Sequence, residues 1–158
     1  MMISEWAPVK EHAKTWIIKA ERRLYAYNDL VAKDKNDRLD LAEMRRAGVV
    51  EGGSKDIIFQ RASGGARVSP QELWQIRVEA MTTRIKETTR ELCRLREAMK
   101  SVRDDAYGEI IPLKYMEGKT DEAIAEILNC DVSTARRNRK RLLRKIAVRL
   151  YGAEAMEL

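Results

Sequence analysis

Basic side chains are the residues of this chain best suited to chemistry with another molecule, and they are concentrated in one segment. Residues 132–149 contain eight basic residues and no acid. They are Arg136, Arg137, Arg139, Lys140, Arg141, Arg144, Lys145 and Arg149. Residues 104–131 have the opposite balance, with eight acids and two bases. A strongly basic helix after an acidic one is typical of an element that binds a polyanion, because the acids limit phosphate binding elsewhere in the module.

Few residues are suited to catalysis or metal binding. His12 is the only histidine, and its charged neighbours indicate a solvated surface position. Most metal sites, and every Ser-His-Asp or Cys-His nucleophile, would have to depend on His12. The sequence has no P-loop, GxGxxG or HExxH pattern, and no carboxylates with metal-ligand spacing beside the basic segment. We therefore expect a protein that is not an enzyme, without catalytic residues, metal or cofactor.

Composition predicts an all-α fold of one or two small domains. The chain has 158 residues, of which 44% are hydrophobic and 35% charged, so it can bury a core and wholesale disorder is not expected. It contains one Phe, three Pro and eight Gly, and helix-favouring residues dominate the remainder. The net charge of +6 favours an anionic partner without identifying it.

Cysteine usage and hydropathy predict a cytoplasmic location. Cys93 and Cys130 form no CxxC pair, and we expect both to be small buried thiols in a reducing compartment. No apolar run is long enough to span a bilayer, and the first ten residues have no signal-peptide core. We therefore expect no membrane partner.

Apolar side chains recur at steps of three and four residues in two long segments. The first carries Ala13, Ile17, Ala20, Leu24, Tyr27 and Val31. The second carries Trp74, Val78, Met81, Ile85, Thr88, Leu92, Leu95, Met99, Val102 and Ala106. This spacing predicts long amphipathic helices with a coiled-coil-like seam. The 74–106 seam either packs on the first helix or joins a second copy of the chain in a homo-oligomer.

Local signals indicate where these helices begin and end. Ser69, Pro70 and Glu72 match the N-cap, N1 and N3 positions of a capping box. After a polar stretch at 34–40, a helix over 39–46 would end at Gly48. A glycine-rich connector at about 48–69 surrounds the apolar residues 57–59. We therefore divide the chain into a helical hairpin with this connector, 1–103, which serves packing or oligomerisation, and a C-terminal module, 104–158.

The C-terminal module is predicted to form three helices, near 104–117, 120–129 and 131–150. Gly118 is suited to end the first helix, and Thr120 and Asp131 to cap the second and third. Asn129 tolerates the left-handed conformation that the turn requires. The residues expected to face inward are Ile124, Ala125, Leu128, Cys130, Ala135, Leu142 and Ile146. The arrangement is that of a helix-turn-helix, whose last helix enters the major groove of DNA.

The segment from Tyr115 to Tyr151 resembles the C-terminal helix-turn-helix of sigma-70 region 4. It shares a Thr-x-x-x-Ile-Ala-x-x-Leu helix followed by a Ser/Thr opening into an Arg/Lys run. The order of helices along the whole chain resembles bacteriophage late-gene and lysis regulators of the ArpU and RinA type. Asn129 and Asn138 depart from the sigma pattern, which has glycine and an aliphatic residue there. The resemblance implies a phage or prophage regulator in the cytoplasm of a bacterial host, with RNA polymerase as a further partner.

The leading hypothesis is therefore a sequence-specific transcriptional regulator that binds double-stranded DNA through helix 131–150. The expected base-reading residues are Ser133, Thr134, Arg136, Arg137 and Lys140. The expected phosphate-binding residues are Arg139, Arg141, Arg144 and Lys145. Two alternatives stay open. One is a small terminase subunit for DNA packaging, and the other is a helical adaptor whose basic C-terminal helix binds an acidic protein or RNA.

Overall fold

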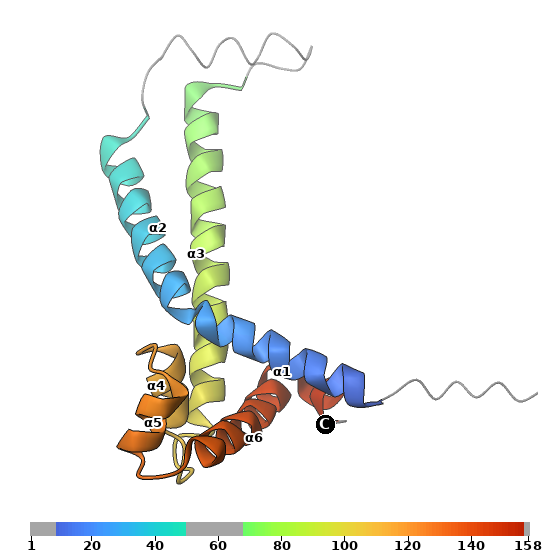
Figure 1. Cartoon of the computed structure of the whole chain (residues 1–158). Coiled ribbons are helices and arrows are strands. Elements are labelled where there is room, and N and C mark those ends of the chain that lie inside the picture. Colours follow the sequence, from blue (N-terminus) through green and yellow to red (C-terminus); the bar gives the residue numbers. More distant parts are fainter. Residues whose placement is uncertain (1–8, 50–67, 157–158) are drawn as a thin grey trace, which may run out of the picture. The chain divides into compact units, whose positions relative to one another are not determined.

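The computed structural model describes residues 9–49 and 68–156, with side chains from Thr15 onward. The α-helices in these ranges are α1 (Val9–Tyr25), α2 (Tyr27–Ala47), α3 (Pro70–Lys100), α4 (Ile110–Tyr115), α5 (Asp121–Ile127) and α6 (Val132–Tyr151), and a short 3-10 helix, η2 (Gly152–Ala155), follows (Figure 1). No strand occurs in the described ranges, which confirms the all-α class. Most of the predicted connector and the side chains of His12 and Ala13 lie outside the described residues.

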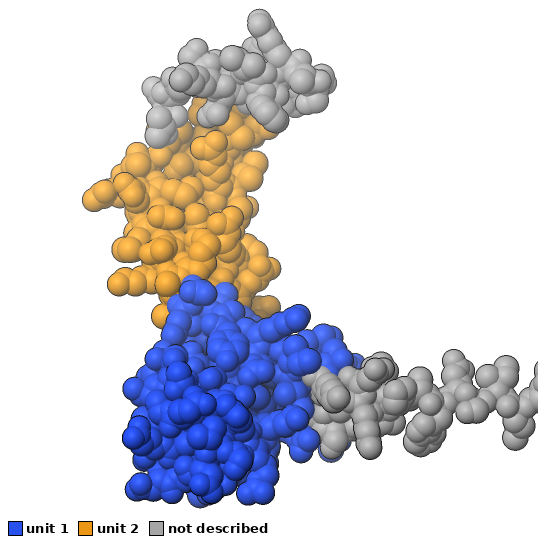
Figure 2. Space-filling model, in the orientation of Figure 1, with its two compact units in different colours: residues 1–30, 91–158 blue, residues 31–90 orange. Residues whose placement is uncertain are grey.

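The chain divides into two compact units (Figure 2). Unit 1 comprises residues 1–30 and 91–158, and unit 2 comprises residues 31–90. Both α2 and α3 cross the boundary between the units. The structure therefore groups α1 and the end of α3 with the C-terminal helices, whereas composition and charge suggested a division at residues 103 and 104.

The core of unit 1 collects one apolar stripe from each of its helices. Ile17, Ala20 and Leu24 of α1 keep the predicted three- and four-residue steps and are buried. The other core members are Leu95, Ala98, Val102, Ile110, Ile111, Tyr115, Ile124, Ala125, Ala135, Leu142, Leu143, Ile146, Ala147 and Ala155. Burial of these stripes is needed most by α4 and α5, because an isolated helix of fewer than about a dozen residues is marginal in water.

Polar and aromatic contacts fix α1 in this core. The hydroxyl of Tyr115 donates a hydrogen bond to Glu21 over 2.6 Å. Burial, together with that hydrogen bond, raises the pKa of Tyr115 well above its usual value. The rings of Trp16 and Tyr151 lie 4.9 Å apart, which ties α1 to the end of α6. These contacts explain why α1 belongs with the C-terminal helices.

Unit 2 is a pair of antiparallel helical segments, residues 31–47 of α2 and 70–90 of α3. The Trp74 indole donates to the carbonyl of Met44 over 3.2 Å, and the Thr89 hydroxyl lies 3.1 Å from Asp34. Leu41 and Ile85 are the buried apolar residues of this unit within the described ranges. The predicted capping box is confirmed, since Ser69 and Glu72 exchange hydrogen bonds of 2.7 and 3.2 Å at the start of α3.

The predicted first helix is two helices. The chain forms a turn at Ala26, and α2 then runs without interruption through the polar stretch at 34–40. Within that stretch Lys33 pairs with Asp37 and Asp34 with Arg38, four residues apart, an arrangement that stabilises helices. Gly48 ends α2 as predicted, with φ of +68°.

The predicted helix over 104–117 is wrong in extent. Residues 101–109 form consecutive turns, and the helix α4 covers only Ile110–Tyr115. Gly108 lies so close to the preceding chain that a Cβ there would meet the carbonyl oxygen of Val102 at 2.5 Å. The seam predicted over 74–106 consequently continues to buried Val102, but Ala106 lies beyond α3 and is exposed.

The expectation of two buried thiols is also wrong. Cys93 is exposed on α3, next to buried Leu92, and Cys130 is half-buried in the turn before α6. A helical position one residue away from a buried leucine turns by about 100°, so Cys93 leaves the core face.

Candidate nucleic-acid interface

The turn between α5 and α6 has the backbone geometry that the sequence predicts. Thr120 caps α5, because its hydroxyl oxygen accepts a hydrogen bond from the backbone N–H of Ala123 over 3.2 Å. Asn129 has φ of +50° and is the one non-glycine residue with positive φ in the part of the chain that the structure describes. Gly118, with φ of +69°, lies in the loop before α5. Local sequence chemistry therefore sets the entry to α6.

Asp131 differs from its expected role. It occupies the N-cap position of α6 with extended backbone angles, but its side chain makes no capping hydrogen bond. The carboxylate is exposed instead. The prediction was correct for the position of the helix start and wrong for the side-chain bond.

Helix α6 has a buried face and a basic exposed face. Ala135, Leu142 and Ile146 are buried, as predicted. Ser133, Arg136, Arg137, Lys140, Arg144, Lys145 and Arg149 are exposed, while Thr134, Arg139 and Arg141 are half-buried. The sequence assigned seven of the eight cations to base reading or phosphate binding, but their salt bridges divide them differently, because four of the eight pair with carboxylates of the same unit.

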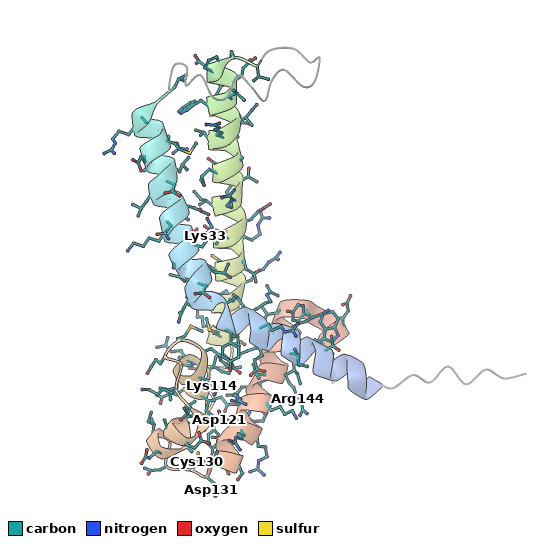
Figure 3. The ribbon with its side chains drawn as sticks, turned by 45° about the horizontal axis from the view of Figure 1, so that its top comes forward. Lys33, Lys114, Asp121, Cys130, Asp131 and Arg144 are labelled. Carbon is teal, nitrogen blue, oxygen red and sulfur yellow. The ribbon has the colours of Figure 1, made fainter. Side chains whose placement is uncertain are left out.

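The first group of paired cations surrounds Asp121, the first residue of α5. Its carboxylate lies 2.5 Å from Arg139, 2.9 Å from Arg136 and 3.2 Å from Lys114. Figure 3 labels Asp121 and Lys114 in this part of the unit. Arg136 also reaches Glu122 over 3.1 Å. Although partial burial alone would raise the pKa of Asp121, the hydrogen bonds from Arg136 and Lys114 lower it below its usual value. This carboxylate therefore stays ionised and joins α4, α5 and α6.

The second group surrounds Asp105, in the turns before α4. Arg141 donates two parallel hydrogen bonds to this carboxylate, of 2.6 and 2.7 Å, and Lys145 lies 3.3 Å away. The hydrogen bonds from Arg141, and a further one from the backbone N–H of Tyr107, hold the pKa of Asp105 far below its usual value. A bidentate arginine–carboxylate pair of this kind is among the stronger charged contacts in proteins.

Three cations of α6 are left along one line. Arg137, Lys140 and Arg144 have no carboxylate partner within the described residues. With Ser133 they are spaced by four, three and four residues, so they lie along one face of the helix. We name Ser133, Arg137, Lys140 and Arg144 the cation stripe. Arg149 is also without a carboxylate partner in this part of the chain, but lies off the stripe.

Nothing in the sequence identified Asp105 and Asp121 as residues of the site. An excess of acids precedes the basic helix, but the sequence does not show which acid neutralises which cation. Arg141 and Asp105 are 36 residues apart, so no helical spacing relates them. The hydrophobic steps that predicted the core of α6 also carry no information on ion pairs.

A hollow of about 400 Å³ lies beside the stripe, between α1 and α6. Ile17, Ile18 and Glu21 line it from α1, and Lys140 and Arg136 are among its α6 residues. Helix α1 therefore borders one side of the stripe, although the sequence predicted α1 to belong to the hairpin of residues 1–103 and not to the C-terminal module.

Features of other site classes are not seen in the described residues. No group of three potential metal ligands occurs in 9–49 or 68–156. Within the same ranges, no helix is both long enough and apolar enough to cross a membrane. Comparison of the chain with protein-family models, with curated proteins and with solved structures gave no match.

Proposed function

We propose that this protein is a sequence-specific transcriptional regulator that binds double-stranded DNA with α6 in the major groove. The cation stripe is the observation that carries the proposal. It is exposed, lies on a single face of α6 and keeps its charge without a carboxylate partner in the described residues. A polyanion that approaches this face meets Arg137, Lys140 and Arg144 directly.

The dimensions of the stripe suit a DNA groove. From Ser133 to Arg144 it spans twelve residues, a rise of about 16 Å along the helix axis. The major groove is about 12 Å wide and admits an α-helix. In helix-turn-helix proteins the N-terminal residues of the second helix contact base edges. We therefore assign Ser133, Thr134, Arg137 and Lys140 to base reading and Arg144 to a phosphate.

The paired cations receive a different role. Arg136, Arg139, Arg141 and Lys145 already contact carboxylates of the same unit. To contact a phosphate, each of them would first have to leave its carboxylate. The loss of that ion pair reduces the binding free energy that the phosphate contact contributes. These residues hold α6 at a fixed angle to α4 and α5, and their contribution to DNA affinity is secondary.

The proposal is tested by enrichment of randomised DNA duplexes on the purified protein. A regulator selects a defined sequence, and the Arg137→Ala variant loses that selection. The Arg149→Ala variant is the matched control, because Arg149 lies on the same helix without a carboxylate partner in the described residues, but off the stripe. Recovery of unselected sequences by the unaltered protein would refute the proposal and favour the adaptor alternative.

A second outcome of the same experiment concerns assembly. A palindromic site would indicate a symmetric dimer, because the symmetry of the half-sites follows that of the protein. Such a site is what a homo-oligomer through the 74–106 segment, one of the two alternatives for that seam, would predict. RNA polymerase as a further partner rests on the family resemblance alone.

A further inference from the structure

Unit 2 contains a groove that the proposed DNA interface does not use. It lies between α2 and α3, with a volume of about 680 Å³. Buried Leu41 and Ile85 form its apolar floor, and exposed Ala42 borders it. Around them stand Arg38 and Arg45 from α2, and Lys86 and Arg90 from α3. The groove thus combines an apolar base with four cations on its rim.

The rim is electrostatically unbalanced. Arg38 bonds to Asp34 and to Thr89, but Arg45, Lys86 and Arg90 have no carboxylate partner within the described residues. None of the residues that line the groove is an acid. A ligand that fits here therefore carries negative charge at its edges and apolar groups at its centre.

The register of the two helices gives the length of the groove. Asp34 lies beside Thr89, and Met44 beside Trp74, so Arg90 marks one end and Arg45 the other. The lining residues extend from Arg38 to Arg45 on α2, a rise of about 10 Å, and from Thr82 to Arg90 on α3, a rise of about 12 Å. About two helical turns of a partner can occupy that length.

We infer that this groove binds an acidic amphipathic helix of a partner protein. Leucine-like side chains three and four residues apart on the partner would pack on Leu41, Ala42 and Ile85. Carboxylates on either flank of that stripe would pair with Arg45 on α2 and with Lys86 and Arg90 on α3. This is the helix-in-groove mode of recognition, in which apolar anchors supply affinity and flanking charges set orientation.

The floor separates this occupant from a nucleic acid. A phosphate backbone would pair with Arg45, Lys86 and Arg90, but it would make no use of the apolar lining of Leu41, Ala42 and Ile85. The inference is also independent of the proposed function, because no residue of the groove belongs to the cation stripe. A negative result for peptide binding therefore does not contradict the proposed DNA binding, and the reverse also holds.

The test uses the full-length protein and a synthetic helical peptide. The peptide carries leucines at three- and four-residue steps on one face and glutamates on both flanks. We expect saturable binding of this peptide, and no binding of the same peptide with lysine in place of glutamate or serine in place of leucine. The Lys86→Glu/Arg90→Glu variant should weaken binding about tenfold or more, since like charges across an interface repel.

Controls locate the binding and guard against unfolding. Lys35→Glu/Arg84→Glu changes the net charge equally at exposed positions of unit 2 that do not line the groove, and should leave the affinity unaltered. Ala42→Trp places a large side chain in the groove without changing its charge and should also abolish binding. Melting curves of all variants check that each is folded.

Three results would overturn the inference. One is the absence of saturable peptide binding to the unaltered protein. Another is an equal loss of affinity in the groove and control charge variants. The third is binding of nucleic acid in the groove instead of the peptide. In that case the affinity for a DNA duplex falls in the Lys86→Glu/Arg90→Glu variant but not in the control variant, while the affinity of the groove variant for the peptide is unchanged. Arg137→Ala should leave peptide binding intact.

Discussion

At the scale of single residues, the carboxylates of unit 1 decide which cations of α6 are available to a ligand. Asp105 and Asp121 are each only about one-seventh exposed, and each contacts at least two cations. Between them they bind Arg136, Arg139, Arg141 and Lys145, all from the basic segment. The charge offered to a polyanion is therefore smaller and more localised than the count of eight cations suggests.

Removal of one of these carboxylates should increase indiscriminate binding. Asp105→Asn takes away the charge that Arg141 and Lys145 contact, so both become free for phosphates. We expect higher affinity for every duplex and a salt dependence steeper by up to about two, since each phosphate contact contributes about 0.9. The measurement is binding to selected and scrambled duplexes over a salt series. An unchanged salt dependence would show that these two cations do not reach DNA even when freed.

The same carboxylate predicts how stability depends on pH. Because the folded-state pKa of Asp105 is lowered, its contribution is fully present above the unfolded value of about 3.9. That contribution is lost as the pH falls through the lower folded-state pKa. The melting temperature should decline on acidification below about pH 4, and less steeply in Asp105→Asn. If the melting temperatures of the unaltered protein and of Asp105→Asn declined equally with pH, Asp105 would not make this contribution.

At the scale of elements, the two helix starts around the turn depend on different chemistry. Thr120 makes a side-chain capping bond, whereas Asp131 does not. Thr120→Ala should therefore cost about 1 kcal/mol of unfolding free energy. Asp131→Ala should cost less, about 0.3–0.5 kcal/mol, which is the lower part of the range expected for a negative charge near a helix start. Urea denaturation of both variants measures the difference, and equal losses would show that Asp131 caps α6 in solution.

The seam of α3 tests the packing of unit 1. Leu95 is fully buried, so Leu95→Asp places an unpaired charge in the core and should cost several kcal/mol. Cys93→Asp is the matched control on the same helix, at an exposed position, and should change stability little. Chemical denaturation compares the two. A stable Leu95→Asp protein would mean that this part of α3 does not face a core.

At the scale of the whole molecule, the sequence predicted what local chemistry determines. Ser69 with Glu72, Thr120 and Asn129 mark boundaries through contacts within a few residues, and the structure confirms each of them. The buried stripe of α6 was also predictable, because its spacing follows the helical period. Long-range contacts were not. The close approach of Gly108 to Val102, which shortens the predicted helix to α4, has no signal in hydrophobic spacing.

The placement of α1 shows the same limit. Its stripe predicted an amphipathic helix correctly, but the partner surface could have been α3, a second copy or the C-terminal module. The pairs Trp16–Tyr151 and Glu21–Tyr115 join it to α6 and α4. Contacts between residues about a hundred positions apart depend on three-dimensional packing, which residue spacing alone does not encode. The cation stripe was likewise hidden among eight similar residues until the pairings were known.

The central claim is that α6 reads DNA through its unpaired stripe, and a comparison of two arginines tests it most directly. Binding of Arg137→Ala and Arg149→Ala is measured on the duplex that the unaltered protein selects and on a scrambled duplex, over a salt series. We predict that Arg137→Ala loses ~1–3 kcal/mol on the selected duplex and much less on the scrambled one. Arg149→Ala should change both affinities equally and little. Equal losses for the two variants on both duplexes would contradict the claim and leave α6 as a generic basic surface.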